Sequence, residues 1–273
     1  MSALSWWTSW SADPPTLAAV LVAGWAYAVG VIRLHNRGDH WRIPRSLSFA
    51  GGLLTVTVAL LSPLASHDER FAVHMVQHLL LGMLAPLLLA LAAPVTLALR
   101  TLPAASRKRL ATMLHGPIVR PAGVPSIAAL LAVGGLYGLY LTPLYAATLR
   151  HPLLHLLVHA HFLLAGCLLA WALIGLDPIA HRPSFRHRAV VLLAALAGHA
   201  ILAKLLYAIP LPSAQLAVAD RQLGAQLLWY GGDLIDAALL IVFFRQWYVA
   251  TGRQLARERR RHRHQTATTI NAP

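Results

Sequence analysis

Long apolar segments recur along the chain, each separated from the next by a short polar or basic stretch. Their lengths are close to the roughly 20 helical residues that cross a hydrocarbon core of about 30 Å. None alternates apolar and polar residues with the period of two that is typical of a membrane-spanning strand. The pattern therefore predicts an all-α, polytopic membrane protein, a bundle of seven transmembrane helices. The expected spans are Thr16–Ile32, Ser46–Ser62, Phe71–Leu99, Pro125–Leu141, Pro152–Leu176, His187–Ala208 and Gln222–Tyr248.

The third segment is the longest, and it contains Pro86 and Pro94. Proline has no amide hydrogen for the helix ladder, and its ring disturbs the preceding turn. We therefore expect this span to kink or to leave the membrane near its end.

Composition excludes several classes of protein. The sequence is 58% hydrophobic and 12% charged, which is far from the balance of a water-soluble domain. The net charge of +14 comes from basic residues dispersed between apolar runs, so it does not predict a nucleic-acid partner, which needs a basic face on a folded surface. Cys167 is the single cysteine, and no disulfide framework can form within one chain.

The distribution of Lys and Arg predicts the orientation, because cytoplasmic loops retain positive charge during insertion. The only Lys or Arg residues in the second, fourth and sixth connections are Arg70, Arg150 and Arg221. The bias predicts an external N-terminus and a cytoplasmic C-terminus. We expect the membrane to be a bacterial inner membrane. The first, third and fifth connections and the tail contain Arg33, Arg37, Arg42, Arg45, Arg100, Arg107, Lys108, Arg109, Arg120, Arg182, Arg186, Arg188, Arg245, Arg253, Arg257, Arg259, Arg260, Arg261 and Arg263.

The C-terminal end differs in composition from the rest of the chain. Residues 1–252 form the predicted transmembrane domain, and residues 253–273 are basic and then Thr-rich. This tail has no apolar face to pack, so we expect it to be disordered and to touch anionic lipid on the cytoplasmic side.

Two histidine pairs stand inside the predicted helices, His74 with His78 and His155 with His159. A spacing of four places both rings of a pair on one helical face, about 6 Å apart along the axis. Both helices run inward from the external side, so the pairs lie at a similar depth and can share a metal. Imidazole suits copper, zinc and iron, and the Met75 thioether could add a ligand for Cu(I), although Met75 also fits a packing role. Hydrogen bonding to headgroups, carbonyls or water is the simpler alternative.

Further polar residues lie within the spans, where a polar group is expensive without a partner or a task. Their expected role is to orient the metal-bound rings by hydrogen bonding or to relay protons. A structural ion pair between Asp233 and Lys204 is an equal alternative, and Asp236 could pair with the sixth span. The candidates are Gln77, His199, Lys204, Tyr230 and Asp233.

Three blocks of the sequence resemble the multi-spanning CtaG-type cytochrome c oxidase assembly factors. The last block departs from the family pattern at Asp220-Arg221 and Leu228, so no role is transferred to that loop. The first block is His74-Met-Val-Gln77-His78-Leu79-Leu80-Leu81 with Ala85-Pro86 and Ala93-Pro94; the second is Leu144-Tyr145, His151-Pro152, His155, His159, Phe162-Leu163, Gly166 and Trp171; the third is Asp220-Arg221-Gln222-Leu223-Gly224, Trp229 and Gly231.

This resemblance implies a function that the residues alone leave open. It implies a non-enzymatic factor that helps to insert copper into a haem–copper oxidase, with His74, His78, His155 and His159 as copper ligands. The copper of such oxidases lies within the membrane toward the external side, at the depth expected for the histidines. The implied partners are oxidase subunit I and an external copper donor, and the chain is expected to be a monomer or a homodimer.

Two other functions remain as alternatives. One is a haem-binding membrane oxidoreductase, in which histidines would be axial ligands of the iron. The other is a metal or proton transporter, in which His199, Lys204 and Asp233 would form a relay.

Overall fold

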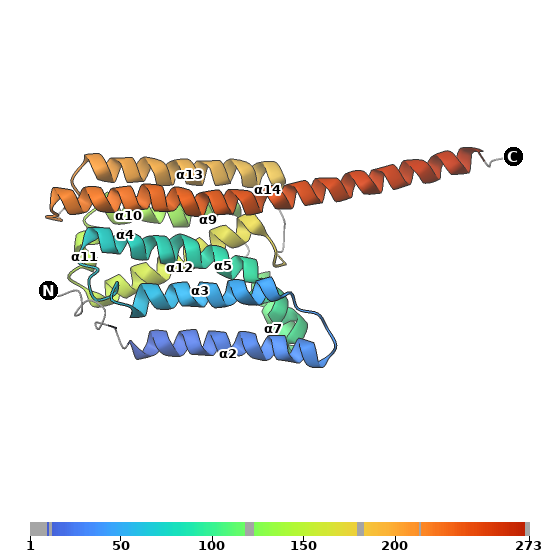
Figure 1. The fold of residues 1–273 in the computed structure, drawn as a ribbon, viewed down its shortest axis with the longest axis horizontal. Coiled ribbons are helices and arrows are strands. Elements are labelled where there is room, and N and C mark those ends of the chain that lie inside the picture. Colours follow the sequence, from blue (N-terminus) through green and yellow to red (C-terminus); the bar gives the residue numbers. More distant parts are fainter. Residues whose placement is uncertain (1–9, 11–12, 118–122, 179–182, 213, 271–273) are drawn as a thin grey trace. The chain divides into compact units, whose positions relative to one another are not determined.

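The computed structural model describes residues 10, 13–117, 123–178, 183–212 and 214–270 and shows only helices and connecting segments in them (Figure 1). Arg120, Arg182 and the end of the predicted tail, residues 271–273, lie outside the described residues. The chain divides into two compact units, Met1–Asp236 and Ala237–Pro273. The helices are α2 (Pro14–Asn36), α3 (Ile43–Leu61), α4 (Phe71–Leu79), η1 (Leu80–Leu84), α5 (Ala85–Ala92), α6 (Pro94–Thr101), α7 (Ala104–Leu114), α9 (Pro125–Ala129), η2 (Leu130–Gly134), α10 (Gly135–Tyr140), α11 (Leu144–Thr148), α12 (Pro152–Ile174), α13 (Phe185–Ala208) and α14 (Val218–Ile270).

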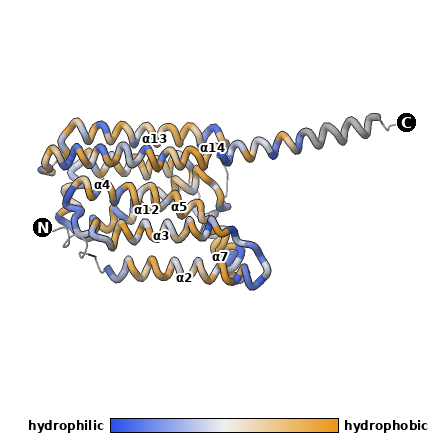
Figure 2. Tube along the Cα trace, viewed as in Figure 1, coloured by the Kyte–Doolittle hydropathy of each residue, from blue (hydrophilic) through white to orange (hydrophobic). Residues whose placement is uncertain are grey.

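Six helical stretches in the described chain are long and apolar enough to cross a membrane, and Figure 2 shows their hydrophobic character. They confirm that the chain is all-helical and multi-spanning. The stretch Pro125–Tyr140 is also apolar but shorter than the others. The six are Pro14–Asn36, Ile43–Leu61, Phe71–Thr101, Pro152–Ile174, Phe185–Ala208 and Val218–Glu258.

Within Met1–Asp236 the helices form a chain of neighbours. Helix α3 packs between α2 and α5, and α12 packs against both η1 and α5 on one side and α9 on the other. Helices α9 and α10 in turn contact α13. Helix α12 therefore lies against the third apolar stretch along much of its length, which brings the two histidine-containing helices together (Figure 1).

The third apolar stretch is irregular where the prolines predict a disturbance. A π-helical turn, η1, precedes Pro86, and the helix breaks at Ala93, which has a left-handed φ of 50° directly before Pro94. Pro86 has no N–H to donate to the carbonyl of Gly82, four residues earlier, and a local π turn is one way in which a helix accommodates such a residue. The break expected near the end of this span is confirmed.

Helix α12 approaches this irregular turn backbone to backbone at Gly166. A Cβ atom on Gly166 would overlap the carbonyl oxygen of Gly82 and lie 2.7 Å from Cγ of Pro86. Only glycine allows two helix axes to come so close, as in the small-residue contacts of membrane helices. The contact fixes the distance between α12 and the helix that contains His74.

Charged side chains hold the helix ends. The Asp220 carboxylate, at the start of α14, accepts hydrogen bonds from the amides of Phe71 and Ala72 at 2.8 and 3.2 Å and so caps α4. The neighbouring Arg221 donates to the carbonyls of Leu206, Tyr207 and Ile209 at the end of α13. Both contacts place charge where the helix dipole favours it, which gives the Asp220-Arg221 pair a structural role.

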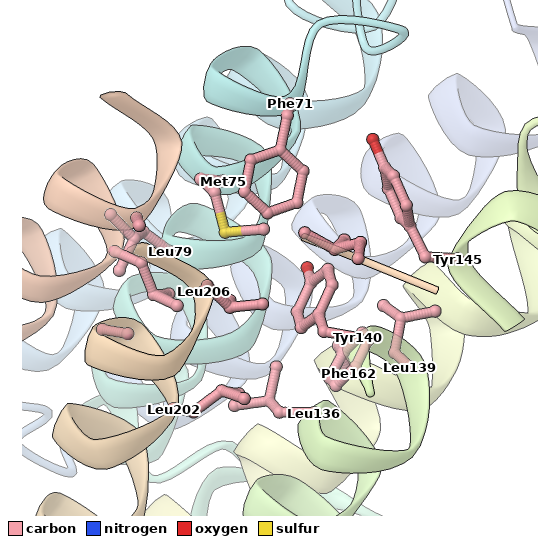
Figure 3. Packing of buried hydrophobic residues seen from close by; sticks show 14 residues of the cluster. Phe71, Met75, Leu79, Leu136, Leu139, Tyr140, Tyr145, Phe162, Leu202 and Leu206 are labelled. Carbon is pink, nitrogen blue, oxygen red and sulfur yellow. The ribbon is translucent and has the colours of Figure 1, made fainter. Parts of the chain in front are cut away.

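A hydrophobic cluster lies along α4 from its first residue to its last (Figure 3). On α4, the cluster contains Phe71, Met75 and Leu79, which lie on one stripe of the helix. Helix α10 contributes Leu139 and Tyr140, and all five side chains are buried. Spacings of four place the α4 residues in contact with the neighbouring helices. The cluster leaves the histidine stripe of α4 free to face in another direction.

The C-terminal segment differs from the sequence expectation. Helix α14 continues to Ile270, whereas composition predicts a disordered tail from residue 253. Six of the residues from 253 to 270 are Arg, which has high intrinsic helix propensity. A helix can therefore form there without an apolar face to pack.

The glycine contact generates a stability prediction. Replacing Gly166→Ala should lower the thermal unfolding midpoint of the purified protein, because overpacking of this kind costs about 1–3 kcal/mol. Gly138→Ala is the matched control, since a Cβ at Gly138 meets nothing within 4 Å, and alanine there should be neutral or stabilising by up to about 1 kcal/mol. Equal midpoints for the two variants would contradict the close-approach interpretation.

Candidate metal centre

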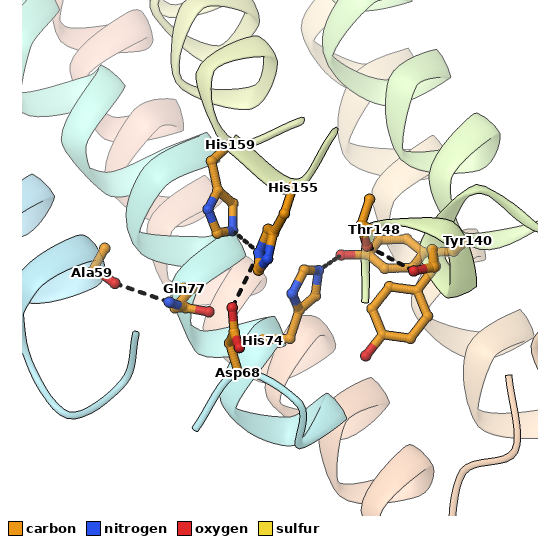
Figure 4. Close-up of polar contacts among 9 residues, drawn as sticks. Ala59, Asp68, His74, Gln77, Tyr140, Thr148, His155 and His159 are labelled. Carbon is orange, nitrogen blue, oxygen red and sulfur yellow. Dashed lines mark hydrogen bonds and ion pairs between the residues drawn. The ribbon is translucent and has the colours of Figure 1, made fainter. Parts of the chain in front are cut away.

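Three histidines converge where α4 faces α12. His74 of α4 and His155 and His159 of α12 each place a ring nitrogen so that the three atoms lie within 4.8 Å of one another (Figure 4). His74 is buried and the other two are half-buried. The expected meeting of the two helices' imidazoles therefore occurs for three of the four rings.

The spacing of these nitrogens suits a common ion. Nε2 of His155 lies 3.2 Å from Nε2 of His159. Bonds of about 2.0–2.1 Å from imidazole to metal place two ligand atoms of a tetrahedral ion about 3.3 Å apart. Small ring movements would complete the approach of His74. Three imidazole ligands with an open fourth position form a set that zinc or copper accepts.

Tyr140 of α10 orients the His74 ring. Its hydroxyl lies 3.1 Å from Nε2 of His74, whereas Nδ1 of His74 is buried without a hydrogen-bond partner in the described chain. Nδ1 is therefore the nitrogen available to an ion. A partner on the opposite ring nitrogen is the usual way in which proteins fix a metal-binding imidazole.

Asp68, in the loop before α4, places a carboxylate at the edge of the cluster. Its Oδ2 lies 3.1 Å from Nε2 of His155. Burial raises the pKa of Asp68, and the nearby His155 lowers it in part. The carboxylate lies against the same ring nitrogen that approaches His159, so it offers negative charge to a bound cation.

His78 does not join the three-ring cluster, which differs from the expected four-histidine ligand set. Its nearest aromatic neighbours include Phe162, at 4.9 Å between ring centroids, and His199, at 6.5 Å. The reason is its place one turn further along α4, where its neighbours are Phe162 of α12 and His199 of α13. His78 and His199 thus form a separate pair.

Two residues expected to support the rings have other neighbours. Met75 is fully buried in the hydrophobic cluster of α4 and packs near Gly224 of α14, so its observed role is packing. Gln77 donates from Nε2 to the carbonyl of Ala59 on α3 at 3.0 Å. Figure 4 shows this amide directed to the side away from His74.

The remaining candidates lie on the outer surface of α13 and α14. Tyr230 is 68% exposed and Asp233 is exposed as well. The Lys204 ammonium lies over the Trp229 ring, 4.6 Å from its centroid, and in the described chain no ion pair joins it to Asp233. These three residues do not line the histidine cluster.

Asp68 and Tyr140 are the site residues that sequence reasoning missed. Tyr140 is distant in sequence from both histidine pairs, and only tertiary packing brings its hydroxyl to His74. Asp68 precedes His74 by six residues. The signal available in the sequence was its place in the expected external connection, next to a helix with histidines. Glu69 and Arg70 have the same place, so this signal did not single out Asp68.

Comparison with known proteins agrees with the family resemblance of the three sequence blocks. Residues 25–250 match the profile of the cytochrome c oxidase caa3 assembly factors. Uncharacterized proteins of Mycobacterium leprae and Mycobacterium tuberculosis are each 30% identical to the chain over 93% of its length. The chain spans 41% of the length of these relatives. No solved structure matches it.

The Asp68 contact generates a prediction about ion binding. Replacing Asp68→Asn removes the negative charge next to His155, so the affinity of the purified protein for Cu(I) should fall by about 10–100-fold while the number of bound ions stays constant. Competition with a chromophoric Cu(I) chelator measures both quantities. Glu69→Gln, one residue away, is the control, and an equal loss in both variants would show a general surface-charge effect instead.

Proposed function

The chain belongs to the family of cytochrome c oxidase caa3 assembly factors, and within that family we propose that it binds copper and helps to insert it into a haem–copper oxidase. The observation that carries the proposal is the convergence of His74, His155 and His159 within 4.8 Å. The role is one of assembly rather than catalysis.

Copper is the ion that connects this geometry with the family. Three imidazoles alone fit copper or zinc. The client of an oxidase assembly factor contains copper beside haem in subunit I, and that copper lies within the membrane. Cu(I) accepts three nitrogen ligands without an additional anion, which suits a site bounded by apolar helices.

The geometry favours a small ion over haem. The ring nitrogens of His74, His155 and His159 converge on one point, whereas axial ligation uses imidazoles perpendicular to a wide porphyrin plane. A relay-based transporter is also less well supported, because Lys204 and Asp233 are exposed on the outer surface of their helices instead of lining a path through the bundle.

The positive residues support seven spans, with Pro125–Tyr140 as the fourth. If this short stretch crosses the membrane, all the strongly basic connections and the C-terminal segment lie on the cytoplasmic side, as the positive-inside rule requires. If it did not cross, Arg186, Arg188 and the basic C-terminal segment would lie outside. The proposed N-terminus is external, and the proposed membrane is the bacterial inner membrane.

This orientation places the metal centre near the external surface, where a copper donor has access through Asp68 and His155. The outer face of α12 beside the histidines is apolar, with Leu153, Leu156 and Leu157 each more than half exposed. A helix of subunit I can pack on such a face within the bilayer. Copper would then pass sideways from the histidines to the oxidase without entering bulk water.

Ion stoichiometry tests the proposed function. The double variant His155→Ala/His159→Ala should lose the copper held at the cluster and, in cells, lower the activity of the copper-dependent oxidase while other respiratory activity continues. His161→Ala is the matched control on the same helix, because His161 contacts the carbonyl of Leu131 instead. Retained copper and full oxidase activity in the double variant would refute the proposal.

Topology has its own test. In a Cys167→Ser background, Gln215→Cys should react with a membrane-impermeant thiol reagent in intact cells, whereas Ser106→Cys should react only after the membrane is opened. Both positions are exposed in the structure. The reverse labelling pattern would invert the proposed orientation, and labelling of both in intact cells would contradict it as well.

A further inference from the structure

A second pair of buried imidazoles lies beyond the three-histidine cluster. His78 of α4 is 5% exposed and His199 of α13 is 6% exposed. Both ring nitrogens of His78 and Nε2 of His199 have no hydrogen-bond partner in the described chain. Buried polar groups are normally paired, and an unpaired one costs free energy. These unpaired nitrogens are therefore available to a ligand.

The two rings have the separation that one shared ion requires. Their centroids are 6.5 Å apart and their planes differ by 27°. With bonds of about 2.0–2.1 Å, two imidazole nitrogens on opposite sides of one ion lie about 4 Å apart, and their ring centroids about 6 Å. The observed centroid distance of 6.5 Å is close to that value.

A carboxylate next to the pair supplies the charge that a cation needs. Oδ2 of Asp236, on α14, lies 4.0 Å from Nδ1 of His199, and Asp236 is itself buried. A buried carboxylate with no cation nearby is expensive. One monovalent ion between the rings would neutralise it, and an imidazole pair selects a soft transition-metal ion over a hard ion that prefers oxygen ligands.

Glycines hold both rings in position. A Cβ atom on Gly232 of α14 would overlap the His199 ring and lie 2.8 Å from its Nδ1. A Cβ atom on Gly82 would lie 3.0 Å from Cε1 of His78. The His199 ring therefore fills space that a side chain on Gly232 would take, and the His78 ring packs closely on Gly82.

We propose that His78 and His199 form a second, inner cation site that takes Cu(I), with the Asp236 carboxylate beside the Nδ1 side of His199 as its counter-charge. Because His78 follows His74 by four residues, this site lies about 6 Å further along α4 than the three-histidine cluster. An ion can move between the two sites through the protein interior. The identification of the ion as copper rests on the proposed function, whereas the existence of a soft-cation site rests on the orphaned nitrogens and the carboxylate.

Anaerobic titration of the full chain in lipid nanodiscs with Cu(I) tests the inference. The unaltered protein should bind two equivalents, His199→Ala one, and His155→Ala/His159→Ala one. The matched control, His187→Ala, removes an exposed histidine on the same helix and should retain two. If the unaltered protein binds a single equivalent, or if His199→Ala leaves the count unchanged, the inner site does not exist.

The same titration separates the two proposals. One equivalent that is lost in His155→Ala/His159→Ala but not in His199→Ala overturns only the inner site. One equivalent that is lost in His199→Ala but not in His155→Ala/His159→Ala overturns the three-histidine cluster and supports the inner site. No binding at all overturns both.

A second variant covers the case in which His199→Ala does not fold. Asp236→Asn preserves the shape of the side chain and removes its charge, so the affinity for the second equivalent should fall about tenfold or more while the first is unchanged. If the affinity for the second equivalent is the same in Asp236→Asn as in the unaltered protein, the carboxylate does not have the assigned role and the charge-neutral inner site is overturned.

Discussion

The close approach of α12 to the irregular third span is the constraint on which the candidate site depends. His74 is on one of these helices and His155 and His159 are on the other, so the distance between the helix axes decides whether three rings can reach one ion. Gly166 and the turn around Gly82 and Pro86 set that distance through a backbone contact. A contact of this kind is rigid, because neither partner has a side chain that can rotate away.

Polar groups in this protein fall into two kinds that the structure separates clearly. Asp220, Arg221 and Asp177 have several hydrogen bonds each to the ends of neighbouring helices, and they stabilise the bundle. The imidazoles of His74 and His78 instead keep buried nitrogens without partners. Unpaired buried imidazole nitrogens are candidates for a ligand, because a polar group within the membrane is expensive without a partner or a task.

The sequence predicted the helical class, the positions of the long spans and the break before Pro94, because apolar length and proline chemistry act locally. It also predicted that rings from α4 and α12 would meet. It could not show that His78 lies near Phe162 and His199 while His74 meets His155 and His159, since a helix meets different neighbours at successive turns. The contacts of Tyr140 and Asp236 likewise depend on which helices are adjacent, which spacing along one chain does not define.

The proposed copper site is one ion held by three imidazoles between α4 and α12. X-ray absorption at the copper edge can count these ligands on His199→Ala protein loaded with one equivalent of Cu(I), in which the inner pair does not contribute. We expect three imidazole nitrogens at about 2.0 Å and no sulfur. Copper bound by sulfur, or by fewer than three imidazoles with no change on replacing His74, would contradict it.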